Sequence, residues 1–158
     1  MKSTKHYMSI ILSTAALLVG MSGVAHAAEP KNAEAIVKYR QAVMMSQGGH
    51  MGAAAAIIQG KVDFKDQLAG HVNALEATTK DIDAMFPKGT DVGKTKALKE
   101  VWTKNDEFRK RAKDAQEKSA ALAKVVAAGD TQNYGPRFKD LADACKACHK
   151  DFRKKEEH

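Results

Sequence analysis

The sequence predicts an all-α fold, an antiparallel up-down four-helix bundle. Proline occurs at only three of the 158 positions, and no segment has the alternating β-branched pattern of strands. Four segments instead repeat apolar residues at steps of three and four, the spacing of one face of a helix. Four amphipathic helices joined by short loops can bury their apolar stripes against one another.

The first two predicted helices cover about residues 32–59 and 63–84. In the first, apolar residues keep helical spacing from Met44 to Ile58, but three glycines predict a weakened helix that can kink: Gly48, Gly49 and Gly52. The second carries one apolar stripe, formed by Phe64, Leu68, Val72, Leu75 and Ile82. A loop by composition follows over residues 86–91.

The third predicted helix has the clearest stripe, made of Leu98, Val101, Asn105, Phe108, Ala112, Ala115, Ser119, Leu122 and Val126. Gly129-Asp130 predicts its end. The fourth has Pro136 early enough for a first helical turn. Its stripe contains both cysteines of the chain and consists of Tyr134, Phe138, Leu141, Cys145, Cys148 and Phe152.

The first 27 residues are predicted to be a secretory signal peptide. Lys2 and Lys5 form a basic start, an apolar run extends from Ile10 to Val19, and Ala25-His26-Ala27 is an A-x-A cleavage site. The apolar run is shorter than the roughly 20 residues of a membrane-spanning helix. We therefore expect one mature domain over residues 28–158 in the periplasm, without stable membrane insertion.

Charge alone assigns no partner to the mature chain. The formal net charge of +7 falls to +5 when Lys2 and Lys5 leave with the signal peptide. Basic residues are interleaved with acidic ones, as in Lys110-Arg111-Ala112-Lys113-Asp114, which is typical of a solvated helix face. An exported protein rarely meets nucleic acid, so we expect no nucleic-acid partner.

The pentapeptide Cys145-Lys146-Ala147-Cys148-His149 matches C-x-x-C-H, the attachment sequence of c-type haem. Each thiol adds to one vinyl group, and the adjacent imidazole has to reach the iron from the same side. On a helix, positions i, i+3 and i+4 share a face. The pattern predicts one covalent haem c, with His149 as an axial ligand of its iron.

Three other uses of the cysteines fit less well. A redox dithiol is expected in a βαβ setting at the start of a helix, and a structural zinc site needs four ligands where only three cluster. A Cys145–Cys148 disulfide is possible in an exported protein, but it leaves the imidazole beside it without a purpose. The remaining histidines of the mature chain, His50, His71 and His158, are predicted to be ordinary polar or surface residues.

Several motifs resemble cytochrome c′, the class II cytochromes c, over nearly the whole mature chain. They are Lys38-Tyr39-Arg40-Gln41 followed by Met44, then Gly52, the loop from Phe86 to Gly93, Glu100-Val101-Trp102, and the C-x-x-C-H pentapeptide with Arg153. The resemblance implies a four-helix bundle, usually a homodimer, whose haem iron is five-coordinate and high-spin. Such an iron binds small gases such as nitric oxide and carbon monoxide.

The resemblance also implies roles for individual residues. Arg40 and Gln41 would contact the haem edge, with the arginine pairing with a propionate, Met44 would cover the sixth iron position, and Arg153 would stand beside the proximal histidine. The predicted cofactor-binding set is Cys145, Cys148, Arg40, Gln41, Met44, Phe86, Thr95, Trp102 and Arg153, with His149 on the iron. Arg40 and Met44 stand at i and i+4, so both can address one ligand.

Three functions remain open at this stage. The first is a five-coordinate haem protein that binds gases or exchanges electrons with an unidentified redox partner. The second is a six-coordinate low-spin electron carrier resembling c-556, in which Met44 is the second axial ligand. The third is a helical binding module without haem. No nucleophile, base and orienting group occur together, so we do not expect an enzyme.

Overall fold

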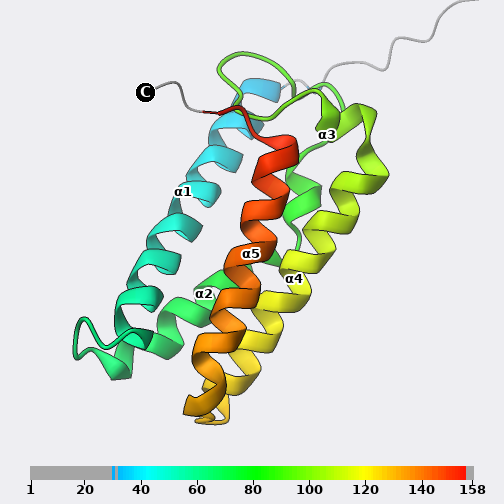
Figure 1. Ribbon diagram of the computed structural model, residues 1–158. Helices are drawn as coiled ribbons and strands as arrows, with labels where there is room; N and C mark the ends of the chain where they lie inside the picture. Colours follow the sequence, from blue (N-terminus) through cyan, green and yellow to red (C-terminus); the bar gives the residue numbers. More distant parts are fainter. Residues whose placement is uncertain (1–29, 31, 156–158) are drawn as a thin grey trace, which may run out of the picture.

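The computed structural model describes residue 30 and residues 32–155; the predicted signal peptide lies outside this part. Its α-helices are drawn and labelled in Figure 1. They are α1 (Ala33–Ile58), α2 (Leu68–Thr79), α3 (Glu100–Thr103), α4 (Asn105–Ala127) and α5 (Tyr134–Phe152). Short 3-10 helices span Lys65–Gln67, Ile82–Met85 and Thr131–Asn133.

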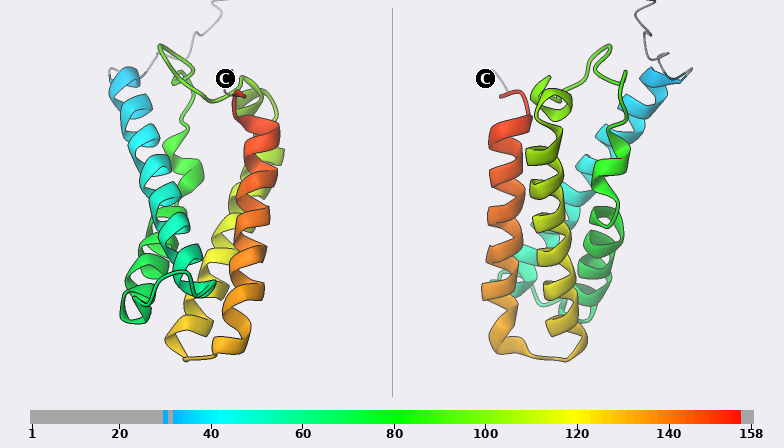
Figure 2. Two further views of the ribbon diagram at one scale, coloured as in Figure 1. Left: turned by 60° about the vertical axis from the view of Figure 1, so that its left-hand side comes forward. Right: turned by 90° about the vertical axis from the view of Figure 1, so that its right-hand side faces the viewer.

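The arrangement confirms the predicted helical bundle. Helices α1, α2, α4 and α5 run alternately down and up, and Figure 2 shows α1 beside α2 and α4 beside α5. The described residues include no strand, only an isolated antiparallel bridge between Ala97 and Arg153. Within the same residues, no helix is long and apolar enough to cross a membrane.

Helix α1 is continuous through its glycines. It extends over 26 residues without a break, so the three glycines do not interrupt its hydrogen bonding. A left-handed glycine ends it: Gly60 has a φ of 67°, and the amide of Lys61 donates to the carbonyl of Ala56 at 2.9 Å. This left-handed C-terminal cap provides amide donors for backbone carbonyls that the end of a helix leaves without partners.

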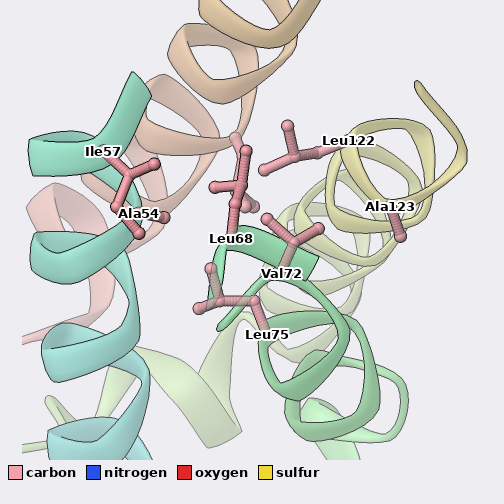
Figure 3. Close-up of a cluster of buried hydrophobic side chains, with 8 residues drawn as sticks. Ala54, Ile57, Leu68, Val72, Leu75, Leu122 and Ala123 are labelled. Carbon is pink, nitrogen blue, oxygen red and sulfur yellow. The ribbon is translucent and has the colours of Figure 1, made fainter. Parts of the chain in front are cut away.

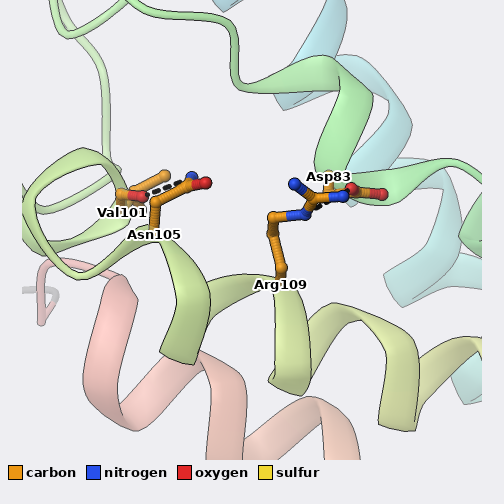
Figure 4. A network of polar contacts seen from close by, with 4 residues as sticks. All are labelled: Asp83, Val101, Asn105 and Arg109. Atoms are coloured by element: carbon orange, nitrogen blue, oxygen red, sulfur yellow. Dashed lines mark hydrogen bonds and ion pairs between the residues drawn. The ribbon is translucent and has the colours of Figure 1, made fainter.

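The predicted third helix is two helices. Lys104 has φ −118° and ψ 47°, which breaks the helical path between α3 and α4. Asn105 is exposed and not part of the core stripe, and its amide donates to the carbonyl of Val101 at 3.2 Å (Figure 4). The spacing of apolar residues did not predict this break, because a polar residue at a stripe position is compatible both with one continuous helix and with two helices. Most of the stripe is buried, including Phe108, Ala112, Ala115, Ser119 and Leu122, while its two ends, Leu98 and Val126, are half-buried.

The predicted second helix is shorter than its periodicity suggested. Helix α2 has 12 residues, and 3-10 turns replace both predicted ends. Phe64 was predicted to face the core, but it is 54% exposed. It lies in the loop before α2, where helical spacing no longer determines the direction of a side chain.

The core divides into two clusters along the bundle. The larger one joins α1, α2, α4 and α5 around Val72, Leu75, Leu122 and Leu141, and Figure 3 shows part of it. Burying such side chains stabilises the fold by about 1.5–3 kcal/mol each. The second cluster consists of Val101, Phe108 and Phe152, with Phe86, Trp102 and Cys148 packed against it.

Candidate functional site

The two cysteines connect these two clusters. Cys145 packs against the larger cluster and Cys148 against the second one. Both are half-buried free thiols on α5, and His149 follows at the exposed edge of the same helix. Because the three residues stand at i, i+3 and i+4 of a continuous helix, they share one face as predicted.

Both thiols are held in their neutral form. Burial raises the pKa of Cys145. Burial, together with the neighbouring Cys145, raises the pKa of Cys148 to about 11, although Arg111 opposes the rise. At pH 7 only about one Cys148 in ten thousand would be a thiolate. Redox dithiols depend on a lowered pKa, so this environment argues against a redox role.

The pKa of His149 is shifted in the opposite direction, downward. Partial burial and the positive charge of Arg153 lower the pKa of its imidazole. The ring is therefore neutral at pH 7, the form in which a nitrogen lone pair can bind a metal. Arg153, one turn after His149, acts on it electrostatically even though it lies beyond the end of α5 in extended backbone.

Four aromatic rings form an apolar wall beside Cys148. Phe108 packs edge-on against Phe86 at 4.8 Å and against Phe152 at 5.3 Å between ring centroids. Trp102 lies 6.4 Å from Phe86. Its indole nitrogen donates to the carbonyls of Phe86 and Pro87 at 3.1 and 3.0 Å. These rings come from α3, α4, α5 and the long loop before α3.

Arg40 ties α1 to that loop. Its side chain is buried, with 3% of the residue exposed. Nη1 donates to the carbonyl of Met85 at 3.2 Å and to Thr90 Oγ1 at 3.1 Å. Nη2 donates to the carbonyl of Thr90 at 3.0 Å and to Thr95 Oγ1 at 2.7 Å. All four Nη hydrogens are thereby donated to loop 85–95.

The charge of Arg40 is surrounded by neutral groups. All four acceptors are carbonyl or hydroxyl oxygens, and the guanidinium carbon lies 4.5 Å from the centroid of Phe86 and 5.7 Å from that of Trp102. Burial lowers its pKa, but arginine stays protonated. Such a cation favours an anion nearby, because a buried charge is costly without a counter-charge.

Further contacts fix the same loop. Gln41 donates from its amide to the carbonyl of Lys94 at 2.9 Å, and Lys154 Nζ donates to the carbonyl of Thr95 at 3.0 Å. Thr90 is fully buried and was not predicted as a site residue. The only sequence signal for it was its place in a loop that follows the Phe86-Pro87 pair, since hydroxyl partners of a distant arginine leave no periodic pattern.

The structure thus gathers the predicted residues in two groups. Arg40, Phe86, Thr95 and Trp102 form one group at the loop. Cys145, Cys148, His149 and Arg153 form the other on and after α5, and the second core cluster links the groups through Cys148. Met44 lies half-buried on α1 one turn after Arg40.

Comparisons with known proteins agree on one family. The family model described as Cytochrome C' matches residues 35–153. A cytochrome c' from Pararhodospirillum photometricum is 38% identical over 121 residues, which is 76% of this chain and 97% of that protein. The chain belongs to the cytochrome c′ family. Proteins of this family carry covalently bound haem c.

Solved structures and a differently named relative extend the comparison. A nitric oxide complex of a variant of cytochrome c prime from Alcaligenes xylosoxidans has a TM-score of 0.74 and 29% identity, covering 81% of this chain and all of that one. Cytochrome c-556 from Agrobacterium tumefaciens (strain B2A) is 31% identical over 121 residues, 75% of this chain and 97% of that protein. The chain is thus similar to relatives under both names.

The residues of this cytochrome c′ family member fit a haem. Two neutral thiols and a neutral imidazole share one helical face, aromatic rings border it, and a buried cation lies at the adjoining loop. A structural zinc site fits poorly, because it needs four protein ligands and this face offers only the two thiols and the imidazole. The observed donor set therefore suits thioether attachment with one protein ligand to iron.

Two histidines were placed wrongly from the sequence. His50 and His71 were predicted as separate surface residues, yet both are half-buried, and their Nδ1 atoms lie 3.0 Å apart between α1 and α2. The prediction failed because it compared each histidine only with its own helix. The third, His158, lies outside the described residues.

Proposed function

We propose that this cytochrome c′ family member is an exported protein whose five-coordinate haem binds nitric oxide or carbon monoxide, or takes part in electron transfer. The observation that carries the proposal is the shared face of Cys145, Cys148 and His149 between two apolar clusters. When bound, haem supplies an iron that accepts a diatomic ligand or an electron. The nitric oxide complex of a solved relative supports the gas-binding part.

In this proposal each side chain has a defined task. Cys145 and Cys148 would hold the haem through thioether bonds, and neutral His149 would supply the protein ligand to its iron. Partial burial and the positive charge of Arg153, one turn further, lower the pKa of the imidazole and favour its unprotonated form. Because the neighbouring apolar clusters exclude water from the thioether side, they favour a dry haem pocket.

Arg40 and Gln41 act at the haem edge by way of the loop. The four Nη hydrogens of Arg40 already bind loop 85–95. We infer that Arg40 attracts a propionate chiefly through its uncompensated charge, while it fixes Phe86 and Thr95 in position. Gln41 supports the same loop through the carbonyl of Lys94.

A homodimer and a periplasmic location belong to the same proposal. Tyr39 and Met45 are large exposed apolar side chains on α1, at 64% and 78%. Met45 borders a shallow, mostly apolar hollow with Lys38, Gln41, Ala42 and Ser46. A second copy of the chain would cover this surface. Export rests on residues 1–27, and the redox partner is unassigned.

A six-coordinate electron carrier is the second candidate. The half-buried position of Met44 one turn from Arg40 and the cytochrome c-556 relative support it. Thioether ligation would occupy the sixth position and raise the reduction potential. In neither case do we infer catalysis of a substrate, since the described side chains serve to hold a haem, whose iron would bind a gas or accept an electron.

Mass spectrometry of protein exported from a host that matures c-type cytochromes tests attachment. We expect residues 28–158 plus one haem, and we expect the double variant Cys145→Ser and Cys148→Ser to lose the haem. A control cytochrome expressed in the same host shows that maturation works. Protein without haem in that host would contradict the proposal.

Nitric oxide added to the ferrous protein should then shift its absorption bands, and an unchanged spectrum would contradict the gas-binding part.

A further inference from the structure

The contact between His50 and His71 lies apart from the haem-attachment residues. His50 belongs to the second half of α1 and His71 to the first turn of α2. Their Nδ1 atoms are 3.0 Å apart, and the ring centroids are 5.3 Å apart with the rings tilted by 53°. No role in the proposed haem site uses either ring.

The helices hold both rings in place. Next to the pair, the amide of Gln47 donates to the carbonyl of Thr78 at 2.9 Å and joins α1 to α2 a second time. Ala54 and Val72, close in sequence to the two histidines, are fully buried in the larger core cluster. The backbones that carry the rings are therefore fixed against each other, so little order has to be gained when a ligand binds between them.

The separation of the two nitrogens suits a shared metal ion. Imidazole binds Zn²⁺ at about 2.0–2.1 Å, so two such ligands on one ion stand roughly 2.8–3.4 Å apart for angles between a right angle and the tetrahedral angle. The observed 3.0 Å lies within this range. Either ring nitrogen of histidine can serve as ligand.

The surroundings determine what else could bind such an ion. One turn before and after each histidine stand Ser46, Gln47, Ala53 and Ala54 on α1, and Leu68, Ala74 and Leu75 on α2 with Gln67 just before it. None of these is a carboxylate, and the Gln47 amide is engaged with Thr78. The protein thus offers two imidazole nitrogen ligands, and water would fill the remaining positions. Such a set favours a borderline divalent ion over Ca²⁺ or Mg²⁺, which prefer oxygen.

We propose that His50 and His71 form a binding site for a divalent transition-metal ion that bridges α1 and α2. Both rings bind through Nδ1: the ring that donates the mutual hydrogen bond transfers its Nδ1 proton to its own Nε2 by way of solvent, and two metal bonds replace the hydrogen bond. Affinity follows the general order for nitrogen sites, with Cu²⁺ above Ni²⁺ and Zn²⁺. The site is separate from the haem iron and independent of its coordination state.

Calorimetric titration of the ferric, haem-loaded protein with Cu²⁺ tests the site. The wild-type chain should bind one ion per protomer at this site, and His50→Ala and His71→Ala should each weaken binding at least about tenfold, because even outer-shell changes at metal sites cost 10–100-fold. The terminal His158→Ala variant is the matched control and should retain the affinity of the wild type.

Two further readouts guard against an unfolded variant or a stray site. Electron paramagnetic resonance of the bound Cu²⁺ should show nitrogen ligands in the wild type and lose them in His71→Asn, which keeps a polar side chain. Cu²⁺ should raise the thermal midpoint of the wild type but not of His71→Asn, since an ion that binds only the folded state stabilises it. Equal binding by the wild type and both alanine variants, or loss of binding only in His158→Ala, would overturn the proposal.

Discussion

Arg40 Nη2 lies 2.7 Å from Thr95 Oγ1, the shortest of the four hydrogen bonds that join α1 to loop 85–95. The residues are 55 positions apart in the chain. Through these hydrogen bonds the buried Arg40 side chain fixes a loop that has no regular secondary structure over most of its length. The same loop supplies Phe86 to the aromatic wall beside Cys148.

Arg40→Gln should destabilise the fold by about 2–4 kcal/mol, because it leaves buried carbonyl and hydroxyl acceptors without donors. The free energy of unfolding in guanidinium chloride measures the loss. Arg109→Gln is the matched control: Arg109 is 65% exposed and 3.7 Å from Asp83, as Figure 4 shows, and it should cost less than about 1 kcal/mol. Equal losses in the two variants would show that the loop contacts contribute little.

Gly129→Ala should cost about 1 kcal/mol, since the φ of 68° at Gly129 is left-handed and strains a residue with a Cβ atom. Gly129 ends α4, where the amide of Asp130 donates to the carbonyl of Val125 at 3.0 Å. In Gly135→Ala the new Cβ meets open space in helix α5, so stability should stay the same or rise slightly. Thermal unfolding compares the two variants, and a larger loss in Gly135→Ala would refute this account.

In the haem-free chain, the raised pKa of Cys148, about 11, predicts slow alkylation at neutral pH. Only the thiolate reacts, so the rate should rise about tenfold per pH unit from pH 7 and level off only near pH 11. Mass spectrometry of iodoacetamide-treated protein follows each cysteine. Unfolding in denaturant removes the burial and should bring the plateau down to near pH 8.5. A plateau near pH 8.5 in the folded chain as well would mean that Cys148 is not buried as described.

The sequence predicted what periodicity and local motifs can encode. The stripes from Phe108 to Leu122 and from Leu141 to Phe152 faced the core as expected, and the C-x-x-C-H pentapeptide indicated its cofactor directly. A short motif on one helix carries its own geometry, because i, i+3 and i+4 converge whatever the rest of the fold does.

Contacts between distant segments could not be predicted in this way. The fully buried Thr90 acts as a partner of Arg40 only because the loop folds back over α1. The His50–His71 pair depends on the relative rotation of two helices. The break at Lys104 depends on backbone angles that the apolar spacing does not specify.

The coordination state of the haem iron tests the central claim most directly, and the measurement is the optical spectrum of the ferric protein with and without Met44→Ala. Packing has to position a thioether for it to bind iron, and we expect Met44 to cover the sixth position without bonding. The wild type should then be high-spin, and Met44→Ala should keep that spin state while nitric oxide enters faster. A low-spin wild type with a sulfur-to-iron charge-transfer band that disappears in Met44→Ala would contradict the five-coordinate account.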